Sequence, residues 1–167
     1  AAGSTPTRSI WTKPDGAHQP MQNNVTRFLT SQKIKFTTLD SEPIKRSAAE
    51  SAALFDLDPA IVYKTIVALR LQPGKPLLLI IPGPLEVDIK KTAAAIGEKK
   101  IRVATQKEAE TLTKLQTGGI SALALLNHGF QILVHKTILE QAQIAVSGGQ
   151  RGLSILMNAQ DFIRITK

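Results

Sequence analysis

The sequence predicts an α+β domain built on a curved mixed, largely antiparallel β-sheet flanked by helices. Two apolar runs, residues 61–69 and 77–81, are separated by the turn sequence QPGKP, which is typical of an antiparallel hairpin. Short strands and capped helices follow one another without the regular alternation of a parallel α/β fold, which favours the α+β class. With 167 residues, the chain fits one domain with a sizeable core.

The composition narrows the classes of function. The chain has no cysteine, which excludes disulfides and a cysteine nucleophile, and its three histidines are a weak basis for a zinc site, so we expect neither metal nor cofactor. A net charge of +8 favours a polyanionic partner such as nucleic acid, while 4% aromatic residues argue against stacking platforms for many bases. No apolar run reaches the roughly 18 residues of a membrane span. We therefore expect a cytoplasmic protein without membrane contact.

The first part of the chain divides into a segment without pattern and a patterned domain. Residues 1–20 are rich in Pro, Gly, Ser and Thr, and we expect an expression leader or a disordered arm. A single domain should occupy residues 21–167. Within it, the apolar spacing of residues 24–32 predicts a helix with an asparagine cap, and a strand should follow near residues 34–39.

The middle of the chain contains the hairpin and the helix that precedes it. Ser47 and Glu50 have the spacing of a capping box, which predicts a helix over residues 47–55. The dipeptide Asp58-Pro59 then ends this helix and leads into the first strand of the hairpin. We expect the hairpin to form the centre of the sheet.

The remaining elements are short. Asp88 is placed to cap a helix over residues 89–96, and Thr105 and Glu108 have the spacing of a second capping box. The other predicted elements are a strand at 101–104, a helix at 105–115, strands at 130–134, 144–147 and 154–157, and a last helix capped by Asn158.

One lysine, Lys64, lies in the middle of the first apolar run of the hairpin. Alternate side chains of a strand point to opposite faces, so Lys64 shares a face with Val62, Ile66 and Ala68. An ammonium on an apolar face usually reaches a cleft, a counter-ion or a ligand, because burying it unpaired is costly. The alternative is an edge strand whose lysine extends to water and discourages aggregation.

Two further stretches are candidates for binding. Gly118 and Gly119 follow a predicted helix, and glycines let a ligand approach backbone N–H groups, although the end of a helix also needs glycine. Basic residues around the helix at 89–96 line a phosphate track or form a solvated charged face. They are Lys90, Lys91, Lys99, Lys100 and Arg102.

Taken together, these stretches resemble the family of YbaK-like aminoacyl-tRNA deacylases, which includes the editing insertion of bacterial prolyl-tRNA synthetase. The resemblance covers residues 21–167, and its pieces occur in the order and spacing of the family. They are Asp58-Pro59 with Val62-Tyr63-Lys64-Thr65, Asp88-Ile89-Lys90-Lys91 with Gly97 and Lys99-Lys100, Gly118-Gly119-Ile120-Ser121, and Ser147-Gly148-Gly149-Gln150-Arg151-Gly152-Leu153.

The resemblance implies hydrolysis of the ester between a wrong amino acid and the terminal adenosine of a tRNA, typically proline tRNA carrying cysteine or alanine. It implies no metal and no protein nucleophile. The family lysine matched by Lys64 is the residue most important for activity, and the loop matched by Gly118 and Gly119 shapes the aminoacyl pocket. Aminoacyl-tRNA is the implied partner, and prolyl-tRNA synthetase is a candidate partner. The other expected substrate-binding residues are Tyr63, Thr65, Ile120, Ser121, Ser147, Gly148, Gly149, Arg151 and His135, and those expected on the tRNA backbone are Lys90, Lys91, Lys99 and Lys100.

Two positions depart from the family pattern. Ala122 follows Ser121 where relatives commonly have proline, and His135 stands where many relatives end a strand with aspartate. Both changes fall near the expected pocket and bear on which amino acid is removed. His135 is a candidate base or, alternatively, a surface or packing residue.

A second class of function is a non-catalytic module that binds a tRNA acceptor end or a synthetase. The presence of Lys64 and of the paired glycines Gly118 and Gly119 favours the enzyme.

Overall fold

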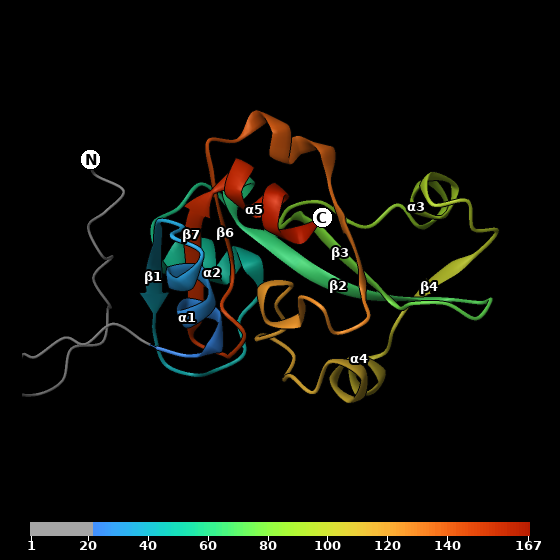
Figure 1. Ribbon diagram of the computed structural model, residues 1–167, viewed down its shortest axis with the longest axis horizontal. Coiled ribbons are helices and arrows are strands. Elements are labelled where there is room, and N and C mark those ends of the chain that lie inside the picture. Colours follow the sequence, from blue (N-terminus) through green and yellow to red (C-terminus); the bar gives the residue numbers. More distant parts are fainter. Residues whose placement is uncertain (1–21) are drawn as a thin grey trace, which may run out of the picture.

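Seven strands form two β-sheets in the computed structural model, which describes residues 22–167. The residues expected to be a leader or an arm, 1–20, lie outside the described part. The strands are β1 (Phe36–Asp40), β2 (Tyr63–Arg70), β3 (Leu77–Pro82), β4 (Ile101–Val103), β5 (Gln131–Val134), β6 (Gln143–Ser147) and β7 (Leu153–Asn158). One sheet has the strand order β1-β7-β6, and the other has the order β4-β2-β3-β5 (Figure 1).

Helices surround the two sheets, and most begin at the caps that the sequence predicts. The capping boxes expected from Ser47 and Thr105 are both present. The predicted single caps Asp88 and Asn158 are also confirmed, while the first helix is capped by Asn23. The helices are α1 (Asn24–Ser31), α2 (Ala48–Leu54), α3 (Ile89–Ala95), α4 (Gln106–Thr113) and α5 (Ala159–Thr166), with 3-10 turns η2 (Pro59–Ile61), η3 (Leu123–Leu125) and η4 (Lys136–Glu140).

The predicted hairpin is confirmed as the centre of the larger sheet. Strands β2 and β3 pair antiparallel, with Lys64 opposite Ile81. Strand β3 also pairs in parallel with β5, whereas the smaller sheet is antiparallel throughout. The fold is therefore α+β with mixed, largely antiparallel pairing, as expected. Its sheet is divided in two, and a parallel bridge between Val62 and Ala145 links the halves.

The start of β2 differs from the predicted strand. Residues Pro59–Ile61 form the 3-10 turn η2, so regular pairing begins at Tyr63 and not at Ile61. The cause is local, because the side chain of Asp58 accepts a hydrogen bond from the N–H of Ala60 at 2.9 Å. Proline at the first position of this turn favours the same geometry. The turn sets the residues before Lys64 against the smaller sheet.

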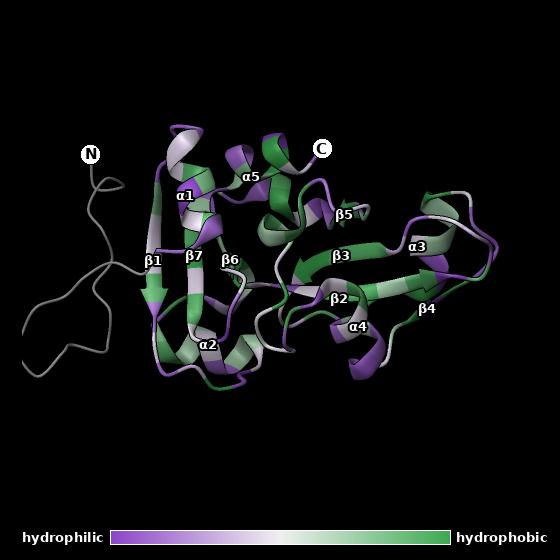
Figure 2. Ribbon diagram, turned by 60° about the horizontal axis from the view of Figure 1, so that its bottom comes forward, coloured by the Kyte–Doolittle hydropathy of each residue, from purple (hydrophilic) through white to green (hydrophobic). Residues whose placement is uncertain are grey.

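Three hydrophobic cores hold the sheets in place, and the third joins α2 to β6. The larger core packs α1 and α5 against both sheets and includes the fully buried side chains Leu29 and Phe162. A smaller core lies at the far end of the hairpin, around Ala68, Leu77 and Ile101. Every residue of β3 is buried, and Figure 2 shows this strand as largely hydrophobic. The hairpin is thus a rigid element whose start reaches the junction of the two sheets.

Candidate active site

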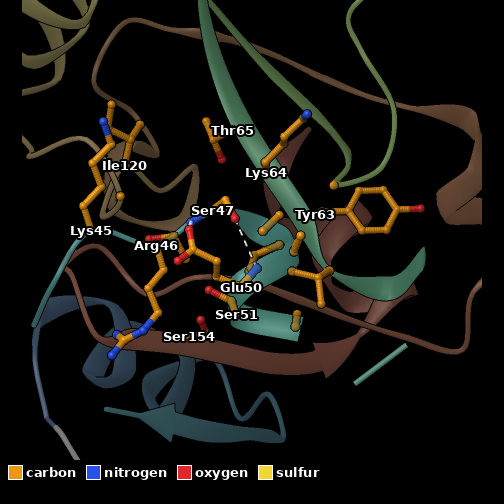
Figure 3. Close-up of a pocket in the computed structure, with 18 of the residues that line it drawn as sticks. Lys45, Arg46, Ser47, Glu50, Ser51, Tyr63, Lys64, Thr65, Ile120 and Ser154 are labelled. Atoms are coloured by element: carbon orange, nitrogen blue, oxygen red, sulfur yellow. Dashed lines mark hydrogen bonds between the residues drawn. The ribbon is translucent and has the colours of Figure 1, made fainter. Parts of the chain in front are cut away.

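A pocket with a volume of about 530 Å³ opens where the two sheets meet. This volume lies within the range of small-molecule sites. Its walls come from six parts of the chain: the β1–α2 connection with α2, the start of β2, the residue after β3, the loop before η3, strand β6, and the start of β7 (Figure 3). Segments that are remote in sequence therefore share one cavity.

Six of the residues predicted to form the site line this pocket. Lys64 enters from β2, and Gly118 enters from the predicted glycine loop, so the two features singled out in the sequence meet in space. The six residues are Tyr63, Lys64, Thr65, Gly118, Ile120 and Ser147.

Lys64 lies at the edge of the pocket and is half-buried. Its side chain is 25% exposed, and its Nζ is 3.9 Å from Oε1 of Glu86, a side chain that is 94% exposed. Ile66, on the same face of β2, packs against the smaller core. The cation is therefore not deeply buried. Strand β2 pairs with β3 at Lys64, opposite Ile81, whereas β4 pairs only with Ala68–Arg70 and does not cover the other edge at Lys64. An exposed carboxylate at 3.9 Å holds the ammonium weakly, which leaves it available to a ligand.

Tyr63 contributes to the wall, but its hydroxyl is directed elsewhere. The hydroxyl lies 2.8 Å from Oγ1 of Thr137, and Figure 3 shows the ring pointing away from Ser47 and Glu50. Burial raises the pKa of Tyr63, and the hydrogen bond with Thr137 partly opposes that rise. Tyr63 is thus a neutral packing residue that fixes the backbone beside Lys64.

The two predicted glycine stretches, residues 118–121 and 147–153, pack against each other beside the pocket. A Cβ on Gly119 would lie 2.8 Å from the backbone nitrogen of Arg151, which is too close for any side chain. Nε of Arg151 donates to the carbonyl oxygen of Thr117 at 2.7 Å. Gly118 has a φ of +95°, which favours glycine. The close approach of the two loops therefore depends on glycine at these positions.

Several other predicted site residues lie outside the lining. The hydroxyl of Ser121 is buried and accepts a hydrogen bond from the N–H of Leu123 at 3.1 Å, so it begins the turn η3. A Cβ on Gly148 would lie 2.6 Å from the side chain of Leu153, so this position has no room for a larger residue. The predicted residues outside the lining are Gly119, Ser121, Gly148, Gly149, Arg151 and His135.

His135 caps the 3-10 turn that follows β5. Its Nδ1 accepts a hydrogen bond from the N–H of Thr137 at 3.2 Å and lies 2.9 Å from the Thr137 hydroxyl, so it caps the 3-10 turn η4. An aspartate would cap such a turn in the same way, through a side-chain oxygen. His135 is therefore the cap of this turn, and Ala122 is buried in the larger core.

The sequence reasoning missed the segment between β1 and α2 as part of the pocket. Lys45, Arg46, Ser47 and Glu50 all line it. Arg46 is held by Nη1, which donates to the Ser41 hydroxyl and to the carbonyl oxygen of Glu42, each at 2.8 Å. The sequence signal that could have revealed this part of the pocket is the basic pair Lys45-Arg46, directly before the capping box of Ser47 and Glu50. Only the tertiary fold places it opposite β2.

The predicted phosphate track lies at the other end of the hairpin. Strand β4 pairs with the last residues of β2, and α3 precedes it (Figure 1). Six strand positions separate Lys64 from Arg70, which corresponds to about 20 Å. The four lysines of this corner are exposed on α3 and the following loop, outside the pocket. They are Lys90, Lys91, Lys99 and Lys100.

Within residues 22–167, no group of three or more His, Asp or Glu side chains is arranged to hold a metal ion. In the same part of the chain, no helix is long and apolar enough to cross a membrane.

The chain and its fold are similar to those of known proteins. A curated relative from Enterococcus faecalis, named "Putative Cys-tRNA(Pro)/Cys-tRNA(Cys) deacylase EbsC", is 29% identical over 150 residues, covering 87% of this chain and 88% of its own. The crystal structure of a "hypothetical protein" matches with a TM-score of 0.78 at 22% identity, covering 86% of this chain and 94% of the other.

A second solved structure shares the fold. The "putative trans-editing enzyme for prolyl tRNA synthetase" matches with a TM-score of 0.70 at 18% identity, covering 88% of this chain and 94% of the other. The family of aminoacyl-tRNA editing domains matches residues 42–165. Because this match spans well over half of the chain, the resemblance drawn from the sequence is confirmed: the protein belongs to the aminoacyl-tRNA editing domain family.

Proposed function

We propose that the protein is a trans-editing hydrolase that cleaves the aminoacyl ester of mischarged tRNA. The proposed substrate is proline tRNA carrying a small non-cognate amino acid such as cysteine or alanine. The observation that carries the proposal is the meeting of Lys64 and Gly118 in one pocket of a member of this family. Prolyl-tRNA synthetase, which would release such tRNAs, is the proposed functional partner.

The chemistry requires little of the protein, because an aminoacyl ester is already activated toward water. Attack on the carbonyl carbon places negative charge on the carbonyl oxygen. The ammonium of Lys64 is placed to donate to that oxygen or to an adjacent phosphate, and its weak contact with Glu86 leaves it free to turn toward substrate. Hydrolysis then breaks the bond between the acyl carbon and the ribose oxygen, and releases the amino acid and intact tRNA.

The pocket also gives a basis for selecting substrates by size. Val62, Ala145 and Val146 form an apolar part of the lining, which suits a small side chain. Gly118 leaves the loop before η3 close to Lys45, where a Cβ would lie 3.3 Å from the Cα of that residue. The amino acid and the terminal adenosine would share the cavity, with the larger cognate proline excluded by shape.

A deacylation assay tests the proposal. Proline tRNA charged separately with cysteine, alanine and proline is incubated with the protein, and loss of the amino acid is measured against the rate without enzyme. We expect accelerated loss of at least one small non-cognate amino acid and little loss of proline. If every ester decays only at the rate without enzyme while the tRNA still binds, the protein is a binding module and the proposal is wrong.

A further inference from the structure

Glu50 is the one carboxylate among the described residues that line the pocket, where Lys45, Arg46 and Lys64 supply positive charge. The end of an aminoacyl-tRNA has a matching distribution of charge. Its phosphates are negative, and its aminoacyl group carries one α-ammonium beside the ester carbonyl. The cations suit the phosphates, which leaves the carboxylate as the group that suits the ammonium.

We propose that Glu50 binds the free α-ammonium of the aminoacyl group and thereby restricts the pocket to esters whose amino group is unmodified. The inference rests on the proposed function, because it names a recognition element for that substrate. It also names the class that is rejected, namely N-acylated esters such as peptidyl-tRNA. Acylation removes the positive charge and leaves the carboxylate facing a neutral amide.

The carboxylate of Glu50 is held in place and is ionised. Its Oε1 accepts a hydrogen bond from the N–H of Ser47 at 3.0 Å, while the Ser47 hydroxyl accepts one from the N–H of Glu50 at 3.1 Å. The hydrogen bond from the Ser47 backbone is the main cause of the lowered pKa of Glu50. This contact uses one oxygen, so Oε2 can accept a hydrogen bond from a ligand.

The charge of Arg46, on the same connection, adds to the lowering of the pKa of Glu50, but the hydrogen bonds of its Nη1 go elsewhere. The guanidinium of Arg46 donates through Nη1 to Ser41 and to the carbonyl of Glu42. Figure 3 shows Glu50 on the side of the pocket opposite Lys64 and Thr65. An ester carbonyl near Lys64 would therefore place its α-ammonium toward the wall formed by α2. One bound aminoacyl group can then use a cation at its carbonyl and an anion at its amine.

The experiment measures binding of stable analogues, so it does not depend on hydrolysis. The probes are adenosines that carry alanine or cysteine in an amide link at the 3′ position, each with a free or an acetylated α-amine. Calorimetry compares the wild-type protein with Glu50→Gln, which keeps the capping box because glutamine serves at this position as glutamate does. The matched control is Glu108→Gln, at the capping box of α4 outside the pocket.

We expect acetylation to weaken binding to the wild-type protein about tenfold or more, the usual loss for a hydrogen bond to a charged group. Glu50→Gln should weaken binding of the free-amine analogue by a similar factor and bind both forms equally. Glu108→Gln should discriminate like the wild type. The inference is overturned if the wild type binds both forms equally, if it binds neither, or if Glu50→Gln still discriminates. Discrimination without any deacylation would instead refute the proposed function and leave the recognition intact.

Discussion

The two ends of the β2–β3 hairpin each carry a cation, but the two cations differ in the number and strength of their contacts within the protein. At the far end, Arg70 donates to Glu98, to Gln131 and to the carbonyl oxygen of Lys75, and its side chain is 12% exposed. At the pocket end, Lys64 has one contact with a carboxylate, 3.9 Å from an exposed side chain. Arg70 is bound by partners within the fold, whereas Lys64 remains available to a ligand.

The contrast distinguishes a charge that the fold uses from a charge that we propose to contact substrate. The partners of Arg70 come from three segments, so its guanidinium joins the hairpin turn, the region before β4 and strand β5. A point charge with one weak partner stabilises little, and that makes it suitable for contact with a developing negative charge.

The largest effect is expected at Lys64. Lys64→Ala should reduce the single-turnover deacylation rate on the order of 10² to 10³-fold, because a preorganised donor is lost. The protein should remain folded, since the ammonium has only one weak partner. Lys64→Arg should also be slow, because a planar guanidinium does not replace a compact ammonium. Lys75→Ala, in the turn at the other end of the hairpin, is the control and should keep the wild-type rate. A Lys64→Ala rate within about threefold of wild type would falsify the assignment.

The next effect concerns binding to tRNA at the far end. Replacing Lys90, Lys91, Lys99 and Lys100 by alanine should lower the slope of log affinity against log salt by about 3, because each phosphate contact contributes roughly 0.7 to 0.9. Filter binding with uncharged tRNA at several salt concentrations measures the slope. Hydrolysis of a short aminoacyl minihelix at saturating concentration should be unchanged. An unaltered slope would show that the basic corner faces only solvent.

A pair of glycines compares the two ends in stability. Gly119→Ala should destabilise the protein by about 1 to 3 kcal/mol through overpacking, because its Cβ would lie 2.8 Å from backbone atoms of the neighbouring loop. Gly97→Ala meets no atom within 4 Å but has a φ of +72°, so it should cost about 1 to 2 kcal/mol of backbone strain. Thermal melts measure both costs. Only Gly119→Ala should also lower the deacylation rate, and an equal loss of rate in both variants would contradict the division between the ends.

The smallest effect on activity is expected at Arg70. Arg70→Met should lower the free energy of unfolding by about 1 to 3 kcal/mol, because Glu98 loses its charged partner in a half-buried position. The deacylation rate at a temperature well below the melt should stay near wild type. Arg102→Met removes the exposed pair with Glu108, whose pKa this contact holds at about 2, and should change stability much less. A rate that falls with Arg70→Met would mean that the far end positions the pocket.

Much of the fold could be predicted because its signals are local. The capping boxes at Ser47 and Thr105 act over three residues, and the hairpin turn acts over five, so each is visible in a short stretch of sequence. The start of β2 was predicted two residues early because the run of apolar residues continues through Ile61. There, a side-chain cap from Asp58 outweighed the preference of β-branched residues for a strand.

The sequence by itself determined the α+β class, the central hairpin, the cation on its apolar face and membership of the editing family. Only the tertiary structure decided which residues line the pocket. It brought Glu50 and Arg46 to the wall, placed Arg151 and His135 outside the lining, and separated the basic corner from Lys64. The physical reason is range: caps and periodicity act between near neighbours, whereas a cavity depends on how distant segments pack. Here that packing depends on glycines that let two loops touch.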